Sequence, residues 1–153
     1  MMLALGMALE GSLEFLWAAH LLSTLMMTGL IWFIQRVHYP LFCQLPPEVF
    51  PHVELFHARR ISWIVIPCML VELGTGIFFL MHEASIYSLV GVILIAIIWL
   101  STFFLQVPCH QKLADTYDVA VCRRLVSTNW IRTIAWSARS ILLLTFPLSE
   151  LPS

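Results

Sequence analysis

Four long apolar stretches constrain the fold of this chain more than any other feature of its sequence. A helix needs roughly 20 mostly apolar residues to cross a hydrocarbon layer about 30 Å thick. Inside that layer the backbone has no water to bond, so each stretch must form a helix that satisfies its own hydrogen bonds. We therefore predict an all-α fold, a four-helix transmembrane bundle of antiparallel up-down topology in a single membrane domain. The four predicted spans are residues 13–34, 61–81, 86–107 and 125–148.

The composition argues against a soluble globular domain. Hydrophobic residues make up 60% of the chain and charged residues only 11%. A soluble domain has about 25% charged residues, because its surface faces water. The formal net charge of −1 provides no basic patch for a nucleic acid. The lipid bilayer is the expected partner, and a nucleic acid is not.

The basic residues outside the spans predict the orientation. All of them lie in two connecting segments, 36–60 and 108–124, whereas both terminal segments and the link between the second and third spans have none. By the positive-inside rule these two loops are cytoplasmic, and both the N- and C-termini are on the outer, periplasmic side. Cytoplasmic thiols stay reduced, so Cys43, Cys109 and Cys122 are expected to be free. The basic residues are Arg36, Arg59, Arg60, Lys112, Arg123 and Arg124.

Prolines and polar residues predict where the spans end. The residue before a proline disfavours helix, so we expect the first span to end near His38, before Pro40. Pro47 suits the first turn of a helix and predicts a short interfacial helix that leads towards the second span. Residues 115–124 are expected to form a helical lead into the fourth span.

Three charged residues lie deep inside the predicted spans, away from their ends: Glu72, Arg132 and Arg139. Such a residue costs about 2.5–3.5 kcal/mol on insertion scales, so it usually faces the bundle interior and has a partner. The helical rise places Glu72 between the two arginines in depth, and we expect it to pair with one of them. This intramembrane charge network is either structural or part of a substrate or proton pathway. Gly74 and Gly76 are expected to allow close helix approach. The predicted polar lining also includes Gln106, Asn129 and Trp136.

Histidines supply the candidate cofactor ligands. An imidazole can ligate a metal or haem iron, or relay protons near neutral pH. Glu54 and His57 form a Glu-x-x-His pattern, which places a carboxylate and an imidazole on one helix face as in carboxylate-bridged metal bundles. They are candidate metal ligands. The alternative is that interfacial histidines only anchor the helix ends. The predicted cofactor-binding residues are His20, His38, His57 and His110.

Four sequence runs carry a resemblance: IWFIQRVHYPLF, FHARRISWIVIPCMLVELGTG, WLSTFFLQVPCH and NWIRTIAWSAR. They resemble a group of short bacterial four-span membrane proteins with no assigned activity. The chain is also similar to the short membrane-bound protoporphyrinogen oxidase family. That similarity implies that His20 matches the haem-ligand histidine of that family. It likewise implies that Arg59, Arg60 and Pro67 match the entry to its second span. The third-span lysine of that family has no counterpart in residues 86–107.

Two functions follow from these patterns. In the first, the polar interior and the cytoplasmic histidines bind a haem or other tetrapyrrole, a porphyrin, a quinone or a metal ion for redox chemistry. In the second, the protein is an accessory or structural subunit of a larger respiratory or photosynthetic membrane complex, and it packs against other membrane subunits, pigments or quinone. A small transporter is less favoured, because the sequence shows no inverted repeat. The expected location is the bacterial inner membrane.

Overall fold

The computed structural model describes residues 2–145, and it is all-helical over this range, which confirms the all-α part of the predicted fold class. Residues 146–148, the end of the predicted fourth span, lie outside the described residues. The side chains are described from Gly11 onwards. The elements are α1 (Met2–Phe33), the π-helical turn η1 (Ile34–His38), α2 (Tyr39–Phe42), α3 (Phe50–His82), α4 (Ile86–Ser101), the π-helical turn η2 (Thr102–Gln106), α5 (Val107–Asp115) and α6 (Val119–Thr145).

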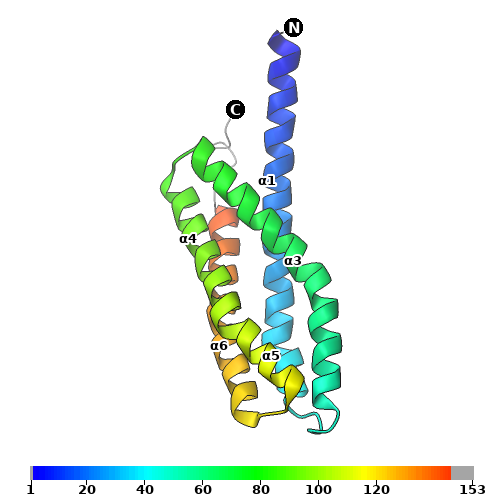
Figure 1. Ribbon diagram of the computed structural model, residues 1–153. Coiled ribbons are helices and arrows are strands. Elements are labelled where there is room, and N and C mark those ends of the chain that lie inside the picture. Colours follow the sequence, from blue (N-terminus) through cyan, green and yellow to red (C-terminus); the bar gives the residue numbers. More distant parts are fainter. Residues whose placement is uncertain (1, 146–153) are drawn as a thin grey trace.

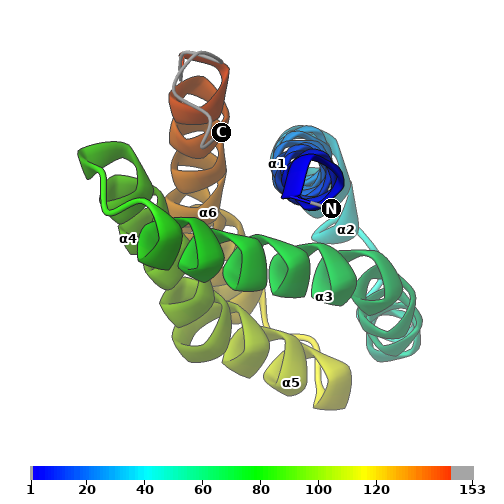
Figure 2. The same ribbon diagram turned by 90° about the horizontal axis from the view of Figure 1, so that it is seen from above.

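The helices form four columns that lie side by side (Figure 1). The first column is α1 with η1 and α2, the second is α3, the third is α4 with η2 and α5, and the fourth is α6. The first column packs against α3 and α6, and the third column packs against the same two helices. Successive columns run in opposite directions, and α3 lies across one side of the bundle when it is seen from above (Figure 2).

Three of the columns are long and apolar enough to cross a membrane: Gly11–Phe42, Phe50–His82 and Ile86–Asp115. Their outer faces carry large exposed apolar side chains, which is the arrangement expected of helices in contact with lipid. The fourth column, α6, is less apolar because it carries four arginines. It nevertheless exposes Ile134 and Ile141 on its outer face. The bundle is therefore apolar outside, and many of its polar side chains are buried.

Two π-helical turns carry the chain past prolines. Pro40 follows η1 and Pro108 follows η2, and each turn is closed by an N–H that bonds a carbonyl five residues earlier. A proline ring in an α-helix clashes with the carbonyl four residues before it, and the wider turn relieves that clash. The predicted end of the first span near His38 is therefore wrong, because the helix continues to Phe42.

The second column is one continuous helix, so the short separate helix predicted from Pro47 is wrong. α3 begins at Phe50 and incorporates the expected interfacial segment. Pro67 lies inside it and removes one backbone hydrogen bond, which explains why α3 changes direction part-way along (Figure 1). The helical lead expected over residues 115–124 begins at Val119, where Asp118 Oδ1 accepts the backbone N–H groups of the first turn of α6.

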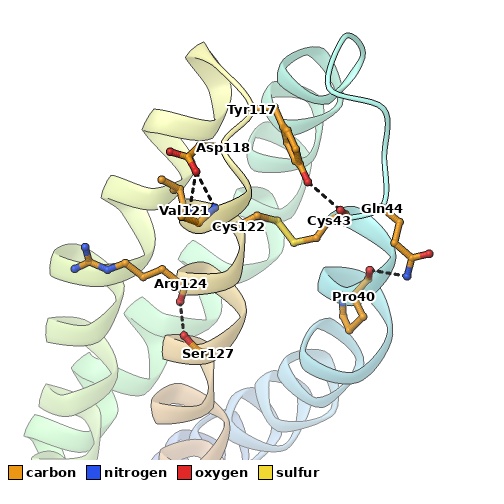
Figure 3. Close-up of a disulfide and its surroundings, with 10 residues drawn as sticks. Pro40, Cys43, Gln44, Tyr117, Asp118, Val121, Cys122, Arg124 and Ser127 are labelled. Atoms are coloured by element: carbon orange, nitrogen blue, oxygen red, sulfur yellow. Dashed lines mark hydrogen bonds between the residues drawn. A yellow bond between two sulfur atoms is a disulfide. The ribbon is translucent and has the colours of Figure 1, made fainter.

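A disulfide joins Cys43 to Cys122, so the prediction that these two thiols are free is wrong (Figure 3). The chain after α2 and the first turn of α6 meet in an apolar cluster that includes Phe42 and Leu125, which brings the two Cα atoms to 6.1 Å. The two cysteines are separated by 79 residues, so the sequence alone could not show their proximity. Cys109, in the same cluster, is free as predicted.

Candidate functional site

Buried polar side chains form two groups along the bundle. The terminal cluster lies towards the end where α1 begins and α6 finishes. The loop-side cluster lies towards the α2–α3 and α5–α6 connections (Figure 1). The terminal cluster comprises His20, Thr24, Glu72, Thr75, Trp136 and Arg139. The loop-side cluster comprises Gln35, Tyr39, Glu54, Gln106, His110, Asn129 and Arg132.

The predicted charge pair is present in the terminal cluster. The Glu72 Oε2 atom lies 3.7 Å from Arg139 Nε, and both side chains are almost completely buried. The Trp136 indole N–H also donates to the carboxylate, with distances of 3.0 and 3.2 Å to its two oxygens. The prediction that Glu72 pairs with one of the two arginines is therefore confirmed, and the partner is Arg139.

The Arg139 guanidinium makes further contacts with the protein through its two terminal nitrogens, whereas its Nε makes no hydrogen bond. Its Nη1 donates to the carbonyl oxygen of Gly91 at 2.8 Å, and its Nη2 donates to Thr24 Oγ1 at 3.1 Å. These contacts tie α6 to α4 and α1, while Glu72 ties it to α3. One buried cation therefore links all four columns.

Both ring nitrogens of His20 face protein groups. The Thr75 hydroxyl donates to a backbone carbonyl one turn earlier, so it must accept from His20 Nδ1, which is 2.5 Å away. His20 Nε2 is then the acceptor, and it faces Arg139 Nη2 at 3.4 Å. His20 is only 4% exposed. The cavity beside it has a volume of about 50 Å³, which is room for one or a few water molecules.

In the loop-side cluster, a chain of amides positions Arg132. The Arg132 Nε and Nη2 atoms both donate to Asn129 Oδ1, at 3.0 and 2.6 Å. The Asn129 amide donates to Gln35 Oε1 at 2.8 Å, and Gln35 in turn donates to the carbonyl oxygen of Val126. Neither of the two ion pairs found within residues 11–145 involves Arg132. This arginine is 6% exposed and has no carboxylate partner there.

Gln106 has one end of its amide satisfied and the other not. Its Nε2 lies 3.0 Å from Thr128 Oγ1. The Thr128 hydroxyl donates to the carbonyl oxygen of Arg124 at 2.7 Å, so it can only accept from Gln106. The amide orientation is thereby fixed, and Gln106 Oε1 is buried without a hydrogen-bond partner.

A second hydrogen-bonded chain runs through His110. The Tyr39 hydroxyl lies 3.1 Å from His110 Nε2, and His110 Nδ1 lies 2.6 Å from Glu54 Oε1. The Tyr39 side chain also interacts with Arg132. Glu54 is completely buried, and its second oxygen, Oε2, has no partner. This series of hydrogen bonds therefore runs from Tyr39 through His110 to Glu54, whose second oxygen is a buried acceptor without a partner.

The remaining predicted cofactor ligands lie together. The His38 and His57 rings stack with their centroids 4.3 Å apart, and the His57 and His110 centroids are 6.0 Å apart. His38 Nε2 is buried without a partner. Glu54 bonds His110 and not His57. In the described part of the chain, no three histidine, cysteine or acidic side chains form a group that could hold a metal ion.

The loop-side cluster borders a cavity of about 540 Å³. Ligand sites in proteins commonly measure about 300–1,000 Å³ and combine apolar walls with a few polar groups. Leu55, Ile66 and Phe103 line this cavity and are more than half exposed, so it reaches the outer surface beside α3 and η2. Its polar lining includes Tyr39, Glu54, His57, Thr102, Gln106, His110 and Arg132, and its apolar lining includes Met27, Ile31, Val65, Met69, Trp99 and Trp136.

Comparison with known proteins adds no assignment: no family model, curated protein or solved structure matches the chain. Both family resemblances therefore remain predictions. The geometry also identifies Tyr39, a residue on the cavity wall that the sequence reasoning missed. Tyr39 lies four residues after Gln35, on the same helix face, and this spacing was the signal that could have found it.

Proposed function

We propose that the protein binds a lipophilic ring cofactor of the haem, porphyrin or quinone type in the loop-side cavity, for redox chemistry within a membrane. The observation that carries this proposal is Arg132, a buried guanidinium with no carboxylate partner at the wall of a 540 Å³ cavity. A buried charge without a partner is costly. A carbonyl or carboxylate oxygen on a ligand would supply the partner.

The remaining walls suit a flat, mostly apolar ligand. Trp99, Phe103 and Trp136 offer aromatic surfaces, and aliphatic side chains cover much of the rest. The His57 ring borders the cavity, and no described residue hydrogen-bonds its nitrogens, so an imidazole is available as an iron ligand. A haem would use His57 and place a carboxylate at Arg132. A quinone would place a carbonyl oxygen there.

We further propose that α6 is the fourth span, that both termini face the periplasm and that the protein lies in the bacterial inner membrane. The apolar outer face of α6 supports the fourth span. The six basic residues outside the spans support the orientation, because all lie in the two segments at the loop end. The Cys43–Cys122 bond lies at that end too. Disulfides are rare in a reducing cytoplasm, so this bond is an observation that opposes the proposed orientation.

The test is native mass spectrometry with an absorption spectrum on gently extracted protein. We expect the wild type to carry a bound small molecule. Ala58→Trp should lose it, since Ala58 lines the cavity and the indole would occupy its space. Ile64→Trp is the matched control, because Ile64 lies on the same helix, outside the cavity lining, and is exposed. A wild type that carries no ligand and takes up neither haem nor quinone would contradict the proposal.

A further inference from the structure

We infer that the ligand of the loop-side cavity carries a ring hydroxyl, as a quinol or another lipophilic phenol does, and that Gln106 recognises it by accepting its O–H hydrogen bond. This inference rests on the proposed function, because it names the chemical class of ligand for the same cavity. It depends on hydrogen-bond directions in the loop-side cluster, which the sequence does not reveal.

The amide oxygen of Gln106 is buried and has no hydrogen-bond partner. Thr128 has a single hydroxyl proton and gives it to a backbone carbonyl, so the Gln106 amide cannot turn over without losing its contact with Thr128. Gln106 Oε1 therefore remains an acceptor, and the protein supplies it with no donor. Buried amide oxygens nearly always have a hydrogen-bond partner. A ligand in the adjoining cavity is the natural source of that donor.

The guanidinium of Arg132 lines the same cavity as Gln106. Thr128 and Arg132 lie one turn apart on α6, and they contact Gln106 and Thr102 of η2 respectively. Gln106 and Arg132 both line the cavity, and their contacts between η2 and α6 lie one turn apart. A hydroxyl oxygen can accept from Arg132 while its proton is donated to Gln106.

A ligand with O–H donors matches the polar lining better than a ligand that offers only acceptors. The carbonyls of a quinone or the carboxylates of a porphyrin would satisfy Arg132 but would leave Gln106 Oε1 without a donor. Glu54 Oε2 is a second acceptor without a partner, and Glu54 borders the same cavity. A ring with two hydroxyl groups, as in a quinol, offers a donor to each of these two oxygens. The lining is therefore better matched to the hydroxylated form of a ring than to its carbonyl form.

A ligand can reach the cavity from the outer surface of the bundle. The cavity reaches the outer surface at Leu55, Ile66 and Phe103, which all belong to columns long and apolar enough to cross a membrane. A ligand that enters there passes from lipid to the cavity without crossing water. This route favours a ring with a hydrocarbon tail, whose tail can stay among the lipid chains while the hydroxylated edge lies at Gln106.

The test compares a short-chain benzoquinol, kept reduced, with its dimethyl ether, in which methyl groups replace the two O–H protons. Their affinities are measured by quenching of tryptophan fluorescence with the full chain in lipid nanodiscs, since two tryptophans line the cavity. We expect the wild type to bind the quinol about tenfold more tightly than the ether. Gln106→Leu should abolish this preference.

The ether is also an internal check on folding, because it needs the cavity but not Gln106. A wild type that binds quinol and ether equally, or a Gln106→Leu variant that keeps the preference, would overturn the inference. If equal binding of both probes is still abolished by Ala58→Trp, the hydroxyl inference fails while the cavity remains a ligand site. If neither these probes nor haem binds, or if Ala58→Trp has no effect on binding, the proposed function fails as well.

Discussion

The two polar clusters of the bundle contain similar residues but differ in how completely the protein satisfies them. In the terminal cluster, Arg139 has a carboxylate, a carbonyl and a hydroxyl around it, and His20 has a protein group at each ring nitrogen. The cavity beside His20 and Arg139 has a volume of about 50 Å³. The charges of this cluster are paired without a ligand, although Arg139 Nε makes no hydrogen bond, and the cluster joins all four columns.

The loop-side cluster is incomplete by the same measures. Arg132 has no carboxylate partner, two acceptor atoms on Gln106 and Glu54 have no donor, and the adjoining cavity measures about 540 Å³. Buried polar groups are usually satisfied, so a cluster that leaves several unsatisfied beside a large cavity is better explained by a ligand than by packing. We therefore assign a structural role to the terminal cluster and a ligand-binding role to the loop-side cluster.

The strongest way to break this comparison is to remove Glu72. The Glu72→Leu variant leaves Arg139 buried without a counter-charge, so we expect the free energy of unfolding to fall by about 3–5 kcal/mol. Denaturant unfolding in detergent micelles measures this loss. The double variant Glu72→Leu/Arg139→Leu is the control, and it should recover much of the stability. A single variant as stable as the wild type would show that the terminal cluster does not stabilise the bundle.

The next largest effect concerns the disulfide at the loop-side end. A bond that closes a separation of 79 residues should stabilise the oxidised protein by about 2–4 kcal/mol. We expect Cys43→Ser and reduced wild type to unfold alike, and both earlier than oxidised wild type. Cys68→Ser, at a buried free thiol, is the matched control.

A membrane-impermeant thiol reagent, applied to intact cells and to inverted vesicles, determines which side of the membrane holds Cys43. Labelling from the periplasm would contradict the proposed orientation.

Replacement of Arg132 should separate binding from stability. The Arg132→Met variant leaves Asn129 Oδ1 without its donors, but it leaves no carboxylate without a counter-charge. We therefore expect the free energy of unfolding to fall by about 1–3 kcal/mol, less than for Glu72→Leu. Its ligand affinity should fall at least about tenfold, since a hydrogen bond to a charged group is lost. Exposed Arg123 on the same helix provides the control, Arg123→Met. If Arg132→Met binds ligand normally, the loop-side cluster is not the binding determinant.

Much of the fold follows from sequence because its causes are local or apply to every membrane helix. Long apolar runs predict helices, and a charge in the middle of such a run predicts a partner, as Glu72 and Arg139 show. Pro40 misled the prediction because the cost of proline depends on the turn around it, and a π turn removes that cost. The Cys43–Cys122 bond was missed because it depends on how two distant segments pack.

The site was less predictable, because the sequence cannot show which polar atoms remain unsatisfied. Arg132 and Arg139 look alike in the sequence, both in the same predicted span, yet only Arg139 reaches the carboxylate. Gln106 was predicted only as lining, since its unpartnered oxygen depends on where the single proton of Thr128 goes. These properties arise from side-chain directions in three dimensions, not from residue types and spacing.

The smallest predicted effects concern Gly74 and Gly76, for which the sequence predicts the same role, namely to allow close helix approach. A Cβ added at Gly76 would lie 2.6 Å from Ile95 Cδ1 and 3.5 Å from His20 Cε1, so α4 and the terminal cluster are packed directly against it. At Gly74, which is exposed, no heavy atom lies within 4 Å of the added Cβ. Gly74→Ala should therefore stabilise the helix by about 0.5–1 kcal/mol through helix propensity alone.

For Gly76→Ala we expect the same gain in helix propensity, offset by the shift that the added methyl group forces on Ile95. The net loss should be less than about 1 kcal/mol, because the end of an isoleucine side chain can move. The difference between the two alanine variants in denaturant unfolding then measures how tightly the terminal cluster is packed. Equal stabilities would show that the Ile95 side chain moves aside at no cost, and that the terminal cluster is not tightly packed against α4.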